Sequence, residues 1–250
     1  MFLELKFRSK QLNKDTQVNI LIPDKTKAPY KTLWLLHGRS GDYTSWMRNT
    51  SIERYANEHG LAVVMPSGDR SWYTNNTYGG NYFNYIAEEL PTLCRGLFKG
   101  MSDKREDQIV GGPSMGGYGA VKLALTCPEK YGACISLSGA LDVTRKGREC
   151  NLEEWKTIFK RDMTSTSELE GGEHDLFALA AKHKAEGQEF PRLYMWCGTE
   201  DSWIGVNQSF DAHLWKLSYP HLFEFSEGNH SWKCWDLHVQ GALDYVLKEP

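Results

Sequence analysis

The chain has 250 residues, and 29 Lys and Arg against 32 Asp and Glu give it a formal net charge of −3. A chain of this length suits one α/β domain better than two small domains. Nucleic-acid and membrane partners are not expected, because the charge is nearly balanced and the sequence has no long basic run and no apolar segment of about 20 residues.

The first elements predicted along the chain are two strands. Residues 3–8 alternate apolar and charged side chains, as in a half-buried strand, and a polar segment separates them from a second strand at residues 17–22. We predict that these two strands form an antiparallel hairpin at one edge of a sheet.

A mostly parallel sheet is predicted for the rest of the chain, because strands alternate there with helices. With the hairpin, eight strands are expected, at residues 3–8, 17–22, 32–36, 62–65, 108–111, 133–137, 192–196 and 222–225. Flanking helices are expected at residues 52–59, 82–98, 118–126, 206–217 and 235–247. Thr50 and Glu53 resemble a capping box before the first helix, and Pro91 is expected to kink the second.

Residues 112–116 read Gly-Pro-Ser-Met-Gly and match G-x-S-x-G, the nucleophile elbow of α/β-hydrolases. The motif lies between an apolar strand and an apolar helix, which is the order that the elbow requires. A sharp strand-to-helix turn holds a serine hydroxyl where a base and backbone N–H groups can reach the reacting atoms. Ser114 is therefore the candidate nucleophile, and the α/β-hydrolase fold is predicted.

The alternation of strands and helices stops between residues 141 and 191, after the sixth strand. A long polar segment replaces the short connection expected there, with helical stretches at residues 152–161 and 175–185. We interpret this segment as an insertion in a single domain of residues 1–250. It would lie over the carboxyl ends of the strands, where open α/β sheets bind ligands. A cap over the site and a surface excursion away from substrate are both compatible with the sequence.

A serine nucleophile needs a histidine base, and α/β-hydrolases place it last in the order Ser, Asp or Glu, His. His230 lies in a turn-rich segment, Glu-Gly-Asn-His-Ser-Trp, directly after the last predicted strand. The other histidines after Ser114 fall in predicted helices, in the insertion or at the start of a strand. We expect them to be surface or packing residues: His174, His183, His213, His221 and His238.

Asp201 is the acid that we favour for orienting His230. It follows the seventh predicted strand, one strand before the histidine loop. The adjacent Glu200 is chemically competent and only loop geometry separates the two, while Asp142, after the sixth strand, is a more distant rival.

The oxyanion hole is predicted to consist of two backbone N–H groups. One belongs to Met115, which follows the nucleophile, and the other to Arg39 in the loop after the third strand, with Ser40 as the reserve. His37, at the start of this loop, is expected to have a structural role, because His230 fills the role of the base better.

Five aromatic residues lie close in sequence to these loops: Trp46, Trp72, Tyr73, Trp203 and Trp232. They are candidates for an aromatic acyl pocket or for stacking on a sugar face. Because the chain has nine tryptophans, core packing must account for several of them. We expect no metal site, since the sequence has no HExxH motif, no close His/Cys cluster and no GxxxxGK[ST] loop.

Several spaced blocks together resemble the esterase D or tributyrin-esterase family, which also includes feruloyl esterases and mycolyltransferases. These blocks span nearly the whole chain: Leu-Leu-His-Gly at 35–38 with Ser-Trp at 45–46, Ser-Trp-Tyr-Thr at 71–74, Gly-Pro-Ser-Met-Gly-Gly at 112–117, Cys-Gly-Thr-Glu-Asp at 197–201 and Gly-Asn-His-Ser-Trp at 228–232. The resemblance implies that Ser114, Asp201 and His230 form the triad, with Arg39 and Met115 as oxyanion donors. Pro113 departs from the usual elbow, because proline fixes the backbone and lacks an N–H donor.

The sequence therefore predicts a serine carboxylesterase that needs no cofactor and hydrolyses small, short-chain acyl esters, with acetylated or feruloylated carbohydrate among the candidate substrates. An acyltransferase and a thioesterase acting on S-formylglutathione would use the same acyl-enzyme, and both stay open as alternatives. A non-catalytic binding domain is a third. The family resemblance also makes a dimer or tetramer reasonable.

The six cysteines bear on the cellular compartment. They are scattered, with no CxxC pair, which is typical of reduced thiols. Residues 1–8 lack the uninterrupted apolar core of a signal peptide. We therefore expect a cytoplasmic location.

Overall fold

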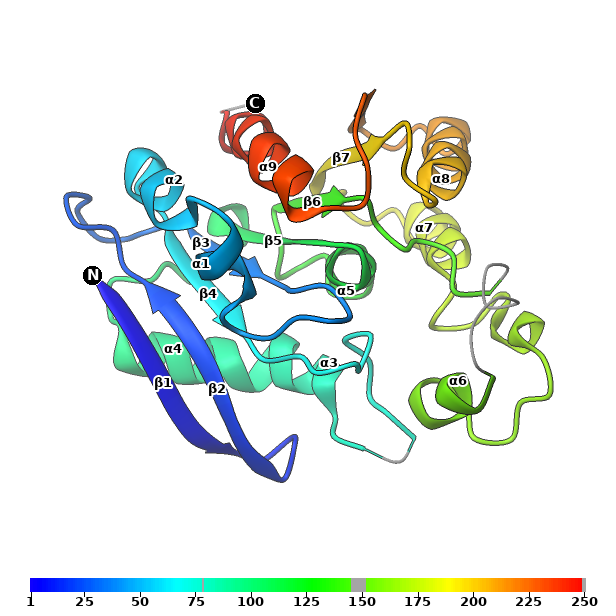
Figure 1. Cartoon of the computed structure of the whole chain (residues 1–250), viewed down its shortest axis with the longest axis horizontal. Helices are drawn as coiled ribbons and strands as arrows, with labels where there is room; N and C mark the ends of the chain where they lie inside the picture. Colours follow the sequence, from blue (N-terminus) through cyan, green and yellow to red (C-terminus); the bar gives the residue numbers. More distant parts are fainter. Residues whose placement is uncertain (78, 145–151, 249–250) are drawn as a thin grey trace.

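The structure is a computed structural model, and it describes residues 1–77, 79–144 and 152–248. An eight-stranded sheet forms the centre of the molecule (Figure 1). The strands are β1 Phe2–Ser9, β2 Lys14–Leu21, β3 Thr32–Leu35, β4 Ala62–Pro66, β5 Gln108–Pro113, β6 Ala133–Leu137, β7 Arg192–Gly198 and β8 His221–Ser226. All eight predicted strands are confirmed, with small differences at their ends.

The strand order is β1-β2-β4-β3-β5-β6-β7-β8. The predicted hairpin is confirmed at one edge, since β1 and β2 pair antiparallel over their full length. β2 also runs antiparallel to β4, and every other neighbouring pair is parallel. The carboxyl ends of β3 to β8 therefore point to the same edge of the sheet, and β5 lies near its middle.

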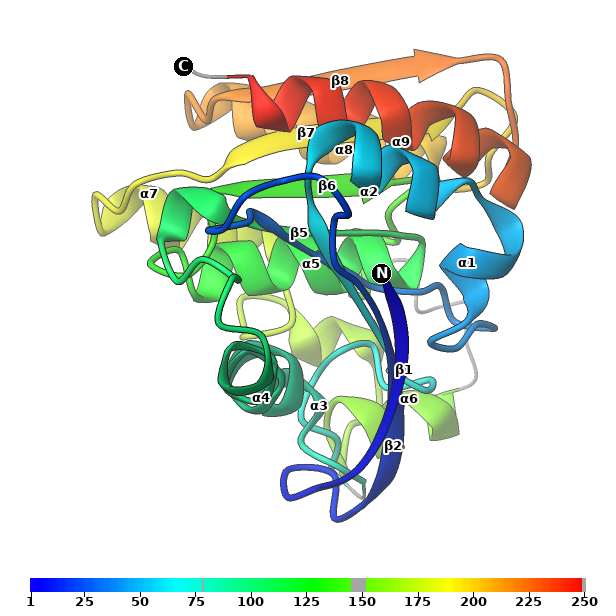
Figure 2. The ribbon, with the colours of Figure 1, turned by 90° about the vertical axis from the view of Figure 1, so that its left-hand side faces the viewer.

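Helices cover both faces of the sheet, as an α/β-hydrolase requires (Figure 2). One face carries α1 Ser45–Asn49, α2 Ile52–His59 and α9 Trp232–Leu247, and the other carries α4 Leu90–Leu97, α5 Met115–Thr126 and α8 Ile204–Lys216. Because successive strand residues point to opposite faces, Ile109 packs in the core under α1, α2 and α9, and Val110 packs in the core under α4, α5 and α8. Both side chains are almost fully buried.

The predicted helix at residues 82–98 consists of three consecutive pieces. These are α3 Tyr82–Asn84, a π-helical turn η1 at Tyr85–Glu89, and α4. Pro91 has no N–H to donate to Ala87, four residues earlier, and the ammonium group of Lys130 donates to that carbonyl instead, at 3.2 Å. The predicted helix is thus interrupted by a π-helical turn that ends two residues before Pro91, and the kink at Pro91 itself stays a prediction.

The predicted capping box at the start of α2 is wrong. The N-cap is Ser51, whose side chain makes no capping hydrogen bond. Thr50 Oγ1 instead accepts from the Ile52 N–H at 3.2 Å and donates to the Trp46 carbonyl at 2.6 Å. The Thr50 hydroxyl therefore bonds the end of α1.

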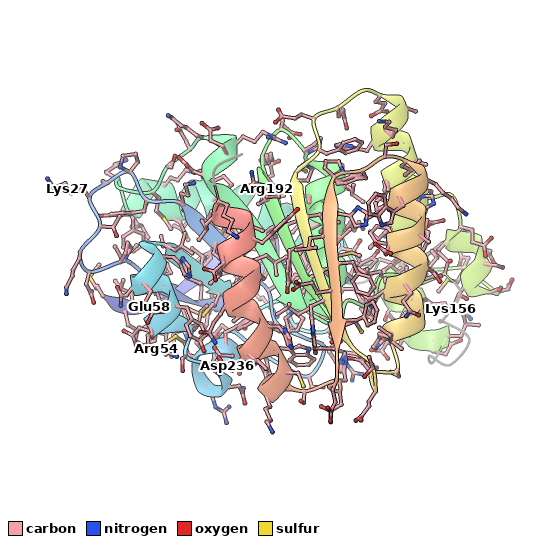
Figure 3. All side chains as sticks on the ribbon, turned by 90° about the horizontal axis from the view of Figure 1, so that it is seen from above. Lys27, Arg54, Glu58, Lys156, Arg192 and Asp236 are labelled. Carbon is pink, nitrogen blue, oxygen red and sulfur yellow. The ribbon has the colours of Figure 1, made fainter. Side chains whose placement is uncertain are left out.

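Hydrogen bonds hold α9 at both of its ends, and Figure 3 labels a residue at each. Near the start, Asp236 accepts from the Ser51 N–H and from the Tyr55 hydroxyl, both at 3.0 Å. Near the end, Arg192 of β7 donates to the Tyr245 carbonyl at 3.2 Å. Because α9 begins two residues after His230, these contacts also fix the histidine loop.

The insertion after β6 carries α6 Leu152–Ile158, a 3₁₀ turn at Thr166–Leu169 and α7 Leu176–Ala185. Both predicted helical stretches are confirmed, although α6 ends three residues before Arg161. α7 packs against α5 and α8, and in Figure 1 both insertion helices lie on the side away from the β1–β2 hairpin. Within the described ranges, no helix combines the length and apolar character needed to cross a bilayer.

Candidate active site

Ser114 occupies the sharp turn between β5 and α5. Its backbone has φ 55° and ψ −119°, a conformation that side chains rarely adopt and that nucleophile elbows require. The two motif glycines let the turn approach β3: a Cβ at Gly112 would lie 2.7 Å from the Leu36 carbonyl oxygen, and one at Gly116 would lie 2.8 Å from that of His37. Glycine is therefore needed at both positions, and the predicted elbow is present.

Pro113 fits the elbow without leaving a ladder carbonyl unsatisfied. The Ser114 N–H donates to the Leu137 carbonyl on the β6 side, at 2.9 Å. Since successive backbone N–H groups point to opposite sides of a strand, the nitrogen of Pro113 faces β3. The β3–β5 hydrogen bonds continue to Leu36, whose N–H donates to the Gly111 carbonyl at 2.7 Å. The Leu36 carbonyl, which would accept the next ladder bond, accepts from the Trp46 indole N–H at 2.8 Å instead, so proline leaves it with a donor.

His230 and Asp201 are paired as predicted. His230 Nδ1 lies 2.8 Å from Asp201 Oδ2, and the other carboxylate oxygen accepts from the Trp203 N–H at 2.9 Å. Burial by itself would raise the pKa of Asp201, but the hydrogen bonds from His230, Trp203 and Ser138 outweigh it and lower that pKa. The carboxylate therefore stays ionised and can hold the Nδ1 proton of the ring.

The two rival acids do not occupy this position. Glu200 is exposed, and its backbone N–H rather than its carboxylate faces the histidine loop, donating to the Gly228 carbonyl at 2.9 Å. Asp142 is buried and accepts from the N–H and the hydroxyl of Thr144, at 3.0 and 2.8 Å. The geometry therefore separates the three carboxylates in favour of Asp201.

Ser114 and His230 line the same cavity, which has a volume of about 710 Å³. The side chain of His230 is about one-third exposed there, and its Nε2 is free to face the cavity because Nδ1 is held by Asp201. In the part of the chain that the structure describes, no side-chain hydrogen bond ties down the Ser114 hydroxyl. Catalytic hydrogen bonds are often formed only when substrate binds, so this arrangement is compatible with a Ser–His pair.

The two predicted oxyanion donors lie next to the nucleophile. Met115 is the first residue of α5, where N–H groups have no partner inside the helix, and the helix dipole adds positive potential. Gly38, before Arg39, lies against the elbow, since a Cβ placed on it would be 3.7 Å from Ser114 Cβ. Among the described residues, neither the Met115 nor the Arg39 N–H donates to a protein acceptor, and Arg39, Ser40 and Met115 all line the cavity.

His37 is structural, as predicted. Its ring is buried, with Nδ1 2.7 Å from the Gly38 carbonyl and Nε2 accepting from the Gly68 N–H at 2.8 Å. Burial lowers the pKa of His37, so the ring is neutral and joins the loops after β3 and β4. Tyr73 adds to this junction, since its hydroxyl donates to the His37 carbonyl at 2.9 Å and accepts from the His37 N–H at 2.8 Å.

Only three of the five predicted aromatic residues line the cavity, namely Trp72, Trp203 and Trp232. Tyr73 is fully buried, which corrects its prediction as a substrate contact. Trp46 is also buried, donates to the Leu36 carbonyl at 2.8 Å and meets Trp232 edge to face at 5.1 Å. Both residues therefore support the walls of the cavity rather than form its surface.

Two further tryptophans of the cavity, Trp155 and Trp235, were missed from the sequence. Trp235 lies three residues after Trp232 in α9, and this helical spacing is a signal that could have identified it. Trp155 belongs to α6 of the insertion and packs against Trp72 with ring centres 5.0 Å apart. No local pattern places that helix at the site, so only the tertiary structure shows that the insertion forms part of the wall.

The other five histidines after Ser114 are packing or surface residues, as predicted, and none of them lines the cavity. His174 and His183 are buried in the insertion. His213 and His221 bond the Phe177 carbonyl and the Asp211 carboxylate, and His238 stacks on Trp196.

Comparisons with known proteins relate the chain to esterases. A family model described as "Putative esterase" matches residues 9–245. A substrate-bound, fluorophosphonate-binding serine hydrolase F of Staphylococcus aureus is 35% identical, with a TM-score of 0.92 over 100% of this chain and 99% of that one. An S-formylglutathione hydrolase of S. aureus is also 35% identical, with a TM-score of 0.89 over 99% of both chains. The acetyl esterase of Caldicellulosiruptor saccharolyticus is 29% identical over 98% of both chains.

Proposed function

The chain belongs to the esterase family whose model matches residues 9–245, it is a serine-dependent carboxylic ester hydrolase, and on this premise we propose that Ser114, His230 and Asp201 are its catalytic triad. The single observation that carries the proposal is the buried Asp201 carboxylate held on His230 Nδ1 at 2.8 Å, at the rim of the cavity that also contains Ser114. A packing histidine would not need a buried acid on one nitrogen and a cavity beside the other.

The proposed reaction is acyl transfer through Ser114. The hydroxyl oxygen attacks the acyl carbon while His230 Nε2 takes the proton, and Asp201 stabilises the imidazolium. The Arg39 and Met115 N–H groups stabilise the oxyanion of the tetrahedral intermediate. His230 returns the proton to the leaving alcohol, and a water molecule then releases the acid from Ser114 by the same steps.

We propose small, short-chain acyl esters as substrates, with acetylated or feruloylated carbohydrate as candidates. The aromatic wall around Ser114 supports this proposal, since tryptophan faces stack on sugar rings and on aryl groups. The likeness to an acetyl esterase supports a small acyl group. A panel of p-nitrophenyl esters of increasing acyl length tests the proposal, and we expect turnover to fall steeply beyond butyrate.

Substitution of the nucleophile tests the triad. We expect Ser114→Ala to remove nearly all hydrolysis of p-nitrophenyl acetate while the far-UV circular dichroism spectrum stays unchanged. A fluorophosphonate should add a covalent mass to Ser114 in the native protein and none in the variant. Retained activity in the folded variant would reject Ser114, and a native protein that neither turns over esters nor takes the label would favour a non-catalytic binding domain.

A thioesterase acting on S-formylglutathione is the second candidate function. The specific support is the solved S-formylglutathione hydrolase with 35% identity over nearly the whole chain. Comparison of kcat/KM for S-formylglutathione and for an acetyl ester of an alcohol distinguishes the two. Product analysis with and without an added acceptor alcohol tests the third possibility of the same chemistry, acyl transfer.

Two further proposals concern the state of the protein. A reducing, cytoplasmic compartment is supported by four free thiols among the described residues, namely the buried Cys94, Cys127 and Cys134 and the partly exposed Cys234, while Cys150 lies outside those residues. A dimer or tetramer is supported by large exposed apolar side chains, among them Trp215 on α8 and Phe225 on the edge strand β8. Light scattering after gel filtration measures the oligomeric state.

A further inference from the structure

Glu154 of α6 forms ion pairs with two arginines that come from different loops of the active-site edge. Its Oε2 lies 2.5 Å from Arg39 Nη2, and its Oε1 lies 3.1 Å from Arg70 Nη2. Arg39 belongs to the loop after β3 and Arg70 to the loop after β4 (Figure 1). We infer that Glu154 is a positioning residue for the oxyanion hole, acting through Arg39, and this inference rests on the proposed function.

The loop that contains Arg39 needs an anchor of this kind. Glycines precede and follow the Arg39–Ser40 pair, and one turn hydrogen bond, from the Gly41 N–H to the Gly38 carbonyl at 2.9 Å, closes the loop. Glycine leaves a backbone more conformational freedom than any other residue. The N–H proposed to bind the oxyanion and the guanidinium bound by Glu154 belong to the same residue, so fixing the side chain restricts the orientation of that N–H.

The second ion pair connects α6 to the aromatic wall. Arg70 lies two residues before Trp72, and the residue after Glu154 is Trp155, which packs on Trp72. Adjacent residues of α6 thus contact the oxyanion loop by charge and the aromatic wall by packing. The insertion therefore holds two sides of the cavity in one relative position.

The burial of Glu154 distinguishes this pair from an ordinary surface ion pair. Its side chain is 20% exposed, whereas that of the neighbouring Glu153 is 76% exposed. A carboxylate that is mostly withdrawn from water and bound by two guanidinium groups is screened less by salt than an exposed pair. Loss of the Glu154 charge should therefore release the Arg39 side chain from its ion pair.

The test replaces Glu154 by an uncharged residue of the same shape. In Glu154→Gln we expect kcat for p-nitrophenyl acetate to fall at least about tenfold, short of the 100-fold to 1000-fold loss that follows removal of an oxyanion donor. KM should change less than about twofold, because the ground-state ester does not depend on the oxyanion hole. The Ki of phenylboronic acid, whose adduct with a serine is tetrahedral, should rise by the same factor as kcat falls.

Glu153→Gln is the matched control. Glu153 pairs with Lys156 at 2.8 Å within α6, and Lys156 lies at the outer side of the molecule, opposite Arg54 and Glu58 of α2 (Figure 3). We expect this variant to keep native kcat and Ki. Native kcat and Ki in a folded Glu154→Gln variant, or an equal loss in Glu153→Gln, would overturn the inference.

Arg39→Met provides a second route in case Glu154→Gln fails to fold. It removes the guanidinium and keeps the backbone N–H, so we expect the same loss of kcat, and the double variant should lose little more than either single one. Native kcat in a folded Arg39→Met variant would also overturn the inference. Failure of the proposed function looks different, because turnover would then survive in Ser114→Ala, whereas failure of this inference leaves Ser114-dependent turnover intact in Glu154→Gln.

Discussion

Replacement of Asp201 by Asn tests the assignment of the acid with almost no change in shape. The carboxylate now accepts from three donors, the His230 ring at Nδ1, the Trp203 N–H and the Ser138 hydroxyl. An asparagine keeps one acceptor, which the Trp203 N–H will occupy because it is a fixed backbone donor. The NH₂ group of the amide must then face His230 Nδ1.

This arrangement gives His230 the wrong tautomer. If Nδ1 accepts from the amide, the ring proton lies on Nε2, which can no longer take the proton of the Ser114 hydroxyl. A loss of charge at the same site removes the stabilisation of the imidazolium as well. An Asp-to-Asn change in a Ser-His-Asp triad lowers kcat about 10,000-fold, which corresponds to about 5.4 kcal/mol of transition-state free energy.

The assay is kcat for p-nitrophenyl acetate at neutral pH, with a thermal melt of each variant to establish that it is folded. Glu200→Gln is the matched control, because Glu200 is exposed and next to Asp201 in the chain. We expect it to keep kcat within about twofold, as substitutions that make no contact with the reacting groups do. A folded Asp201→Asn variant with more than a tenth of native kcat would refute the reasoning, and a large loss in Glu200→Gln would move the acid to Glu200.

Gly116→Ala should destabilise the elbow by about 1–3 kcal/mol and lower kcat, because its Cβ would lie 2.8 Å from the His37 carbonyl oxygen; a native melting temperature and native turnover would contradict this. Trp155→Leu should raise the ratio of kcat/KM for hexanoate over acetate esters about tenfold by enlarging the cavity beside Trp72, and an unchanged ratio would remove Trp155 from the acyl pocket. Burial and the nearby Lys122 lower the pKa of His174 from 6.5 to about 3. The unfolded chain therefore takes up its proton first as the pH falls, and the free energy of unfolding should drop by about 2 kcal/mol between about pH 7.5 and pH 5 in urea titrations. His174→Gln should flatten that pH dependence, and an equal slope in both proteins would count against it.

The strands and the elbow could be predicted because their signals are local. A run of apolar residues bounded by polar turns indicates a buried strand wherever it occurs, and all eight such runs are strands in the structure. The glycines on either side of Ser114 are needed by the turn itself, so the five-residue pattern, together with the apolar strand before it and the apolar helix after it, identified the elbow. The capping box at Thr50 failed because the Thr50 hydroxyl bonds the Trp46 carbonyl of the preceding helix, and a tertiary contact, from the Ser51 N–H to the Asp236 carboxylate of α9, satisfies the N-cap residue.

The candidate acid needed the structure for its final choice. Glu200 and Asp201 are adjacent in the chain, and which of them turns inwards depends on how the loop after β7 meets the loop after β8. The sequence favoured Asp201, but the common chemistry of the two carboxylates left Glu200 as a rival. In the structure Asp201 Oδ2 lies 2.8 Å from His230 Nδ1, and this contact selects Asp201 as the candidate acid.

The sequence by itself determined the reaction chemistry, since it supplies a serine on a strand-to-helix turn, followed by an acid and a histidine after successive strands. The tertiary structure alone decided the shape of the cavity. It brings Trp155 and Glu154 of the insertion to the loops after β3 and β4, and it buries Trp46 and Tyr73 behind them. The physical reason is range: turns and strand ends depend on neighbours in the chain, whereas the docking of α6 depends on ion pairs and ring contacts between residues more than eighty positions apart.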